Sequence, residues 1–258
     1  MHFAKNIQFL TRHHELLGDA QKLSEMSVAL SEGDIFIAKQ VVDKTLLVEL
    51  RHYLTQIGKN SLPNYQKIEA GAPNFHRINY LDERAYVKAS FHQFSFFPWN
   101  QDVFGLFDIV KDIYAVRNLL AGLAANKFLS RTPEADCTAR LSFQFYPRGT
   151  SGMNTHVDPY DFHQVVVPIL MLSKKGEDFQ EGGAYVERAD GSKIIFDDHA
   201  DIGDVIYFHA SLPHGVLPVD PDVKQNWLAF QGRWVMLAAV NRLATNQTIS
   251  NSVEMGKK

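Results

Sequence analysis

Apolar side chains recur with two different periods along this chain, and the period changes near residue 139. In residues 43–57 they return every three or four positions, which is the spacing of one helix face. Asp43 is predicted to cap this helix, because a carboxylate can accept from the free N–H groups of the first turn. A second helix is predicted over residues 103–114, and the polar segment 61–74, punctuated by glycine and proline, is predicted to be a loop.

From residue 139 onward the pattern becomes short runs of apolar, β-branched and aromatic residues between turn residues. Such runs are typical of strands in an all-β unit. The predicted strands cover residues 139–146, 153–158, 163–172, 184–187, 193–196, 205–208, 215–219 and 227–240. Eight short strands with turns between them indicate a sandwich or a jelly roll.

We predict a single domain over residues 1–258, since this length suits one large core. Residues 1–135 are expected to form a helical and mixed N-terminal support that also supplies a substrate lid. Residues 136–243 are expected to form the β core. Residues 244–258 are polar, rich in serine and asparagine, and are expected to fray.

The composition, the net charge and the cysteine content argue against several classes of protein and of site. With 45% hydrophobic and 21% charged residues the chain has the composition of a soluble globular protein, and its net charge of −3 gives no reason to expect nucleic acid or anionic membrane as a partner. Cys137 is the single cysteine, so neither an internal disulfide nor a cysteine-based zinc site is possible. The first residues lack the pattern of a signal peptide, and no apolar run approaches the ~20 residues of a membrane span. We therefore expect a cytoplasmic protein.

The triplet His156-Val157-Asp158 carries the most chemical information. On a strand, side chains at i and i+2 leave the same face, so the imidazole and the carboxylate can converge on one metal ion. His214 is the best candidate for a third ligand. Two histidines and one carboxylate with open positions form the arrangement used by non-haem Fe(II) oxygenases, although a zinc hydrolase also accepts this set.

Other residues compete for the same role. His209 is a rival third ligand, but a strand-end histidine bonded to backbone is the preferred interpretation. Asp161 and His163 form a second acid and histidine pair, which fits a turn and the start of a strand better than a metal site.

Arg233 and Tyr146 are candidate binding residues for a cosubstrate. Arg233 lies on the predicted strand that follows His214, and its guanidinium offers two parallel donors to a carboxylate such as the far end of 2-oxoglutarate. Pairing with a structural carboxylate such as Asp204 is the alternative. Tyr146 begins the turn before the metal motif and could donate its hydroxyl to the same cosubstrate.

The ordered set of motifs resembles the Fe(II)/2-oxoglutarate-dependent dioxygenase superfamily, and its prolyl 4-hydroxylase-like branch most closely. The resemblance covers residues 139–240, and its motifs are Tyr146-x-x-Gly149, His156-x-Asp158, Glu181-Gly182-Gly183, the run from Gly203 to Phe208, and His214 followed by Val216 and Pro218-Val219. It implies a double-stranded β-helix (a cupin-like jelly roll) flanked by helices, with His156, Asp158 and His214 as iron ligands and Arg233 at the cosubstrate carboxylate. The implied cofactors are Fe(II), with 2-oxoglutarate and O2 as cosubstrates and ascorbate as a stimulant.

Two features adjust what the resemblance implies. Several protein prolyl hydroxylases carry tyrosine where Met153 stands and another where this chain has Leu170 or Met171, so a protein-bound proline is not implied as the substrate. Related halogenases replace the motif aspartate, whereas Asp158 is present, so hydroxylation or another oxidation, with release of succinate and CO2, is expected.

We expect a small-molecule substrate, such as an amino acid derivative or a biosynthetic intermediate, and the sequence leaves the oligomeric state open. A protein or peptide hydroxylase is the nearest alternative. From another class come a cupin-like metal-dependent lyase or isomerase, and a binding barrel without activity. The aromatic run 91–100 fits either core packing of a strand against the barrel or a substrate-pocket wall, with core packing preferred.

Overall fold

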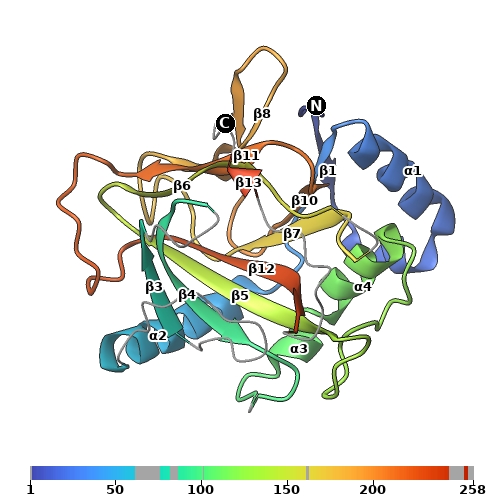
Figure 1. The fold of residues 1–258 in the computed structure, drawn as a ribbon, viewed down its shortest axis with the longest axis horizontal. Helices are drawn as coiled ribbons and strands as arrows, with labels where there is room; N and C mark the ends of the chain where they lie inside the picture. The colour runs from blue at the N-terminus through green and yellow to red at the C-terminus, as the bar shows by residue number, and fades with distance from the viewer. Residues whose placement is uncertain are drawn as a thin grey trace.

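The computed structural model describes residues 2–61, 76–81, 87–100, 102–160, 163–243 and 253–254 (Figure 1). Its helices are α1 (Ala20–Ser31), α2 (Lys44–Asn60), α3 (Leu106–Ile109) and α4 (Lys111–Leu120), with the 3-10 helices η1 (His13–Gly18) and η2 (Phe196–Asp198). The strands are β1 (Ile7–Leu10), β2 (Ile35–Ala38), β3 (His76–Tyr80), β4 (Ser90–Phe96), β5 (Cys137–Pro147), β6 (Ser151–Val157), β7 (Val166–Met171), β8 (Gly183–Glu187), β9 (Lys193–Ile195), β10 (Val205–His209), β11 (His214–Val219), β12 (Gly232–Arg242) and β13 (Val253–Glu254).

The strands form two sheets. The larger sheet has eight strands in the order β1-β2-β10-β7-β12-β5-β4-β3, and the smaller has five in the order β13-β6-β11-β8-β9. From β5 to β12 the chain passes back and forth between the two sheets, which is the winding of a double-stranded β-helix. The predicted fold class, mainly β with N-terminal helices beside a jelly-roll core, is confirmed.

Two apolar cores separate three layers of structure. One lies between the helices and the larger sheet and includes Leu50 of α2, Phe143 of β5 and Trp234 of β12. The other lies between the two sheets and includes Phe208 and Val216. The larger sheet is therefore covered on both faces, with the smaller sheet above it and α2 and α3 below it in the view of Figure 1.

The predicted helix over residues 43–57 is confirmed as α2. Asp43 caps it, because its Oδ1 accepts from the N–H of Leu46 at 3.0 Å. The predicted helix over 103–114 is wrong in its bounds. Gly105 precedes α3 with a left-handed φ of 65°, and Val110, with φ −101° and ψ 7°, separates α3 from α4. Helix α1 was not predicted.

Each of the eight predicted strands overlaps one of β5 to β12. The last is corrected at its start: β12 begins at Gly232, because the Oδ1 of Asn226 accepts from the N–H of Leu228 at 3.0 Å in a preceding turn and Phe230 has a φ of 52°. The predicted loop 61–74 lies outside the described residues except for Ser61. Strands β1 to β3 were not predicted, whereas β4 overlaps the aromatic run 91–100, for which a strand packed against the barrel was the preferred interpretation.

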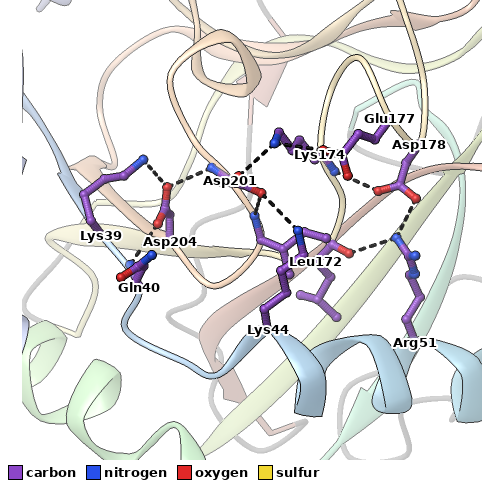
Figure 2. A network of polar contacts seen from close by, with 11 residues as sticks. Lys39, Gln40, Lys44, Arg51, Leu172, Lys174, Glu177, Asp178, Asp201 and Asp204 are labelled. Carbon is purple, nitrogen blue, oxygen red and sulfur yellow. Dashed lines mark hydrogen bonds and ion pairs between the residues drawn. The ribbon is translucent and has the colours of Figure 1, made fainter.

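A network of polar contacts ties the segment between β2 and α2 to the loops beside β7 and β10 (Figure 2). The buried carboxylate of Asp204 pairs with Lys39 and accepts from the N–H of Gln40 at 2.8 Å. Arg51 of α2 donates to Asp178 at 2.8 Å. These contacts fix α2 against the barrel and occupy Asp204, so Asp204 is not the carboxylate that pairs with Arg233.

The C-terminal segment contributes one strand to the smaller sheet. In β13, Val253 pairs with Val157 and Glu254 with His156. The expected frayed tail therefore contains a paired strand, and the division at residue 136 stays a prediction. Among the described residues, no helix combines the length and the apolar character that crossing a membrane would need.

Candidate active site

Three of the predicted site residues meet at adjoining ends of β6 and β11. His156 lies in β6, Asp158 follows that strand directly, and His214 opens β11. Antiparallel pairing puts His214 opposite His156, and the two ring centroids are 4.2 Å apart. One potential ligand atom from each of the three residues can be chosen so that all lie within 4.8 Å of one another.

The spacing of these atoms suits a metal ion. The Nε2 of His156 is 3.6 Å from Oδ1 of Asp158, and the Nε2 of His214 is 3.5 Å from Oδ2. Two neighbouring ligands of an octahedral metal, each 2.0–2.2 Å from it, are about 2.8–3.1 Å apart. Movements of roughly half an ångström would bring each histidine Nε2 to that distance from the carboxylate.

Hydrogen bonds to backbone prepare both histidines as ligands. The Nδ1 of His156 bonds to the carbonyl oxygen of Asn154 at 2.9 Å, and the Nδ1 of His214 bonds to that of Leu212 at 2.8 Å. A carbonyl only accepts, so each Nδ1 carries the proton and each Nε2 keeps its lone pair. Such bonds fix the tautomer and the ring orientation of metal-binding histidines.

The rival ligand His209 lies outside this cluster. Its Nδ1 is 2.7 Å from the hydroxyl of Ser211, and its ring contacts His2 and Tyr160. Burial lowers the pKa of His209 to about 4, with the charge of His2 adding to the effect. His163 is likewise elsewhere, with Nε2 4.0 Å from the sulfur of Cys137, and Asp161 lies outside the described residues.

Arg233 is buried, and it already has one acidic partner. Its Nε donates to Asp197 of η2 at 2.8 Å and 3.0 Å, so the structural carboxylate is Asp197 rather than Asp204. The Nη2 of Arg233 is buried and makes no hydrogen bond within the described part of the chain. Because such a group loses its hydration without compensation, it indicates a place for a ligand acceptor.

Asp197 explains the second glycine of the Gly182-Gly183 turn. Gly183 has a φ of 119°, and a Cβ there would lie 2.7 Å from Oδ2 of Asp197. The same Oδ2 accepts from the N–H of Ala184 at 2.8 Å. Glycine therefore lets the turn approach the carboxylate that holds Arg233.

Tyr146 lies beside Arg233 on the paired strand. The Cζ of Arg233 is 5.6 Å from the centroid of the Tyr146 ring, and the Tyr146 hydroxyl donates to Oε1 of Gln144 at 2.7 Å. Burial raises the pKa of Tyr146, opposed by the charge of Arg233, so the phenol stays neutral. Phe91, from the aromatic run, contacts this ring at 5.3 Å, whereas Phe94 of that run packs in the outer core.

Several inward-facing polar residues on β5 were missed by the sequence analysis. Arg140, Ser142 and Gln144 alternate with Leu141 and Phe143, which pack in the outer core. The alternation of polar and apolar residues in a buried strand was the available signal. Asp197 had no comparable signal, because it lies in a 3-10 helix 36 residues before its partner.

Comparison with known proteins identifies the fold. No family model and no curated protein sequence matches this chain. A prolyl-4-hydroxylase from Pseudomonas putida superposes with a TM-score of 0.51 at 17% sequence identity, over 85% of this chain and 98% of that one. The structure of JOX2 in complex with 2OG, Fe and JA superposes with a TM-score of 0.52 at 15% identity, over 98% of this chain and 78% of that one. The resemblance to Fe(II)/2-oxoglutarate oxygenases is thus confirmed at the level of fold.

Proposed function

We propose that this chain is an Fe(II)- and 2-oxoglutarate-dependent dioxygenase that hydroxylates an unactivated C–H bond of a small molecule. The observation that carries the proposal is the pair of histidine Nε2 atoms turned toward the carboxylate of Asp158. Two imidazoles and one carboxylate leave coordination positions for a bidentate 2-oxo acid and O2. The unpaired Nη2 of Arg233, which lines the same barrel, adds a place for a second carboxylate.

In this proposal the protein supplies position and a dry environment. Ferrous iron together with 2-oxoglutarate supplies the oxidising chemistry when bound. His156, Asp158 and His214 would hold the metal, with the backbone carbonyls of Asn154 and Leu212 orienting the rings. Arg233 would bind the far carboxylate of 2-oxoglutarate, while Asp197 and the Tyr146 ring keep the guanidinium in place.

A small molecule is the proposed substrate rather than a protein. Met153 of β6 stands where the resemblance to protein prolyl hydroxylases would require tyrosine. The neighbouring folds include a structure of JOX2 that contains JA together with 2OG and Fe. Both observations support a substrate smaller than a folded protein.

Succinate release tests the proposal. The full chain is reconstituted anaerobically with Fe(II), then given 2-oxoglutarate, ascorbate and O2, and succinate is measured over time. We expect slow, metal-dependent succinate formation without added substrate, and no formation by Asp158→Ala. Absence of both 2-oxoglutarate binding and succinate would refute the oxygenase and favour a lyase, an isomerase or a binding barrel.

Arg233→Ala tests the cosubstrate site separately. Loss of a charge-assisted pair costs about 1.5–3 kcal/mol, which corresponds to roughly 10- to 150-fold in affinity. We expect the concentration of 2-oxoglutarate needed for half-maximal succinate release to rise by that factor. An unchanged requirement would show that Arg233 does not bind the cosubstrate.

A further inference from the structure

The inner face of β5 carries a row of polar side chains that runs away from Arg233. The register between β5 and β12 is unbroken, with Tyr146 opposite Arg233 and Arg140 opposite Ala239. Six positions of β5 separate Tyr146 from Arg140, which at 3.4 Å per residue is about 20 Å. Arg140 therefore marks the other end of the barrel wall from the cosubstrate arginine.

Arg140 is a half-buried cation, and among the described residues it has no acidic partner. Its Nη1 donates to Oδ1 of Asn241 at 3.2 Å, and its Nε atom is buried and makes no hydrogen bond to any described residue. In the ranges that the structure describes, no carboxylate lies within ion-pair distance of it. Burial lowers the pKa of the guanidinium, and the nearby Tyr114 and the charge of Asp158 oppose this effect. Because an uncompensated buried charge is costly, an anionic ligand would stabilise this arginine.

Ser142 adds a second unpaired group on the same face. It is the next inward-facing residue after Arg140, the residue is 1% exposed, and its Oγ has no hydrogen-bond partner in the part of the chain that the structure describes. Gln144, two positions further, is paired with the hydroxyl of Tyr146. Across the sheet, Ser95 of β4 lies opposite Ser142 and accepts from Gln93 at 3.1 Å. The unpaired groups on this strand are thus gathered at its Arg140 end.

The proposed metal site is coupled electrostatically to both parts of this face. The charge of Asp158 acts on Tyr146, beside Arg233, and also on Arg140. Because Arg140 and Arg233 lie at different positions along the strand pair, a ligand anchored at Arg140 would not occupy the place proposed for the far carboxylate of 2-oxoglutarate.

We propose that the substrate is a small carboxylic acid whose carboxylate is bound by Arg140 and Ser142. The inference rests on the proposed function, because it names the substrate class of that same site. A guanidinium and a hydroxyl on one strand face can each donate to a carboxylate. The remainder of the molecule lies toward Asp158, where the C–H bond to be oxidised is presented.

The test uses the full chain loaded with Mn(II) and saturating 2-oxoglutarate, so that no turnover occurs. Binding of 2-oxoglutarate to the wild type is measured first by calorimetry, because its absence would refute the proposed function and not this inference. The probes are benzoate, phenylacetate and N-acetyl amino acids, each compared with its carboxamide. We expect at least one acid to bind, and its carboxamide to bind at least tenfold more weakly.

Three variants assign that preference to the site. Arg140→Gln is expected to weaken binding of the acid about 10- to 100-fold and Ser142→Ala about fivefold. Arg140→Lys keeps the positive charge and is expected to keep part of the preference for the acid over its carboxamide. It replaces Arg140→Gln in the test if that variant does not fold. Arg188→Gln, which removes an exposed arginine from the turn after β8, should leave acid binding unchanged. A loaded wild type that binds no acid of the series, or an acid preference that survives in Arg140→Gln, would overturn the inference.

Discussion

Mild acid is expected to destabilise the fold through a pair of buried histidines far from the metal ligands in sequence. His76 of β3 and His92 of β4 belong to one chain of hydrogen bonds. The Oγ of Ser61 lies 2.7 Å from Nδ1 of His76, and the Nε2 of His76 lies 3.0 Å from Nδ1 of His92. The Nε2 of His92 lies 3.0 Å from the carbonyl oxygen of Trp227. The carbonyl only accepts, so His92 donates to it, accepts from His76, and both rings are neutral.

The magnitude follows from the two pKa values. Burial lowers the pKa of His76 to about 4 and that of His92 to about 3, with the charge of His76 adding to the effect on His92. In the unfolded chain both histidines have a pKa near 6.5. The free energy of unfolding is therefore unaffected by these histidines well above pH 6.5, and it decreases as the pH falls from there toward the lower pKa values of the folded state. At pH 5 each histidine lowers the free energy of unfolding by about 2 kcal/mol, and the two together lower it by about 4 kcal/mol.

Urea unfolding at pH 7, 6 and 5 measures this effect. His92→Phe removes one titrating ring, so the loss of unfolding free energy between pH 7 and pH 5 should shrink by about 2 kcal/mol, whatever the variant's stability at pH 7. His52→Phe, at an exposed position of α2, serves as the control and should keep the wild-type pH dependence. Equal pH dependence in His92→Phe and the wild type would refute the argument from burial.

Three further substitutions probe the site. Asp158→Ala is expected to abolish Mn(II) binding in calorimetry, whereas the exposed Asp190→Ala should retain it; equal binding by both would remove Asp158 from the ligand set. Asp197→Asn should weaken 2-oxoglutarate binding by about tenfold while metal binding persists, because it removes the charge that orients Arg233; an unchanged Kd would exclude that role. Gly183→Ala should lower the unfolding free energy by about 2 kcal/mol or more, and an unaltered urea midpoint would contradict the close approach to Asp197.

The strands of the barrel could be predicted because their sequence carries local signals. Turn residues separate the runs from β5 to β12, and the His156-x-Asp158 spacing follows directly from strand geometry. Strand β2 was not predicted because its four residues form a short apolar run in the half of the chain that was interpreted as helical, and the period of such a run does not distinguish a strand from part of a helix. Helix α1 buries only Met26 and Leu30, which leaves too faint an apolar period to recognise.

The metal ligands of the candidate site could be predicted from the sequence, but the contacts around Arg233 could not. His156, Asp158 and His214 could be chosen by residue type and order, whereas the partner of Arg233 depends on how η2 lies against the barrel. Sequence spacing carries no information about that contact. Arg140 was visible in the alternation of β5, but its missing counter-ion is a property of the folded chain alone.

The strand β13 has a consequence for how other polypeptides could approach this protein. Strand β6 carries His156, and Val253 and Glu254 occupy its outer edge by antiparallel pairing. An exposed edge of this kind would be a template for an extended peptide or for a strand of another molecule. Because the chain itself pairs with the His156–Val157 end of this edge, an incoming peptide that pairs with that end of β6 must first displace these two residues. Strand addition there would compete with an intramolecular partner at high effective concentration.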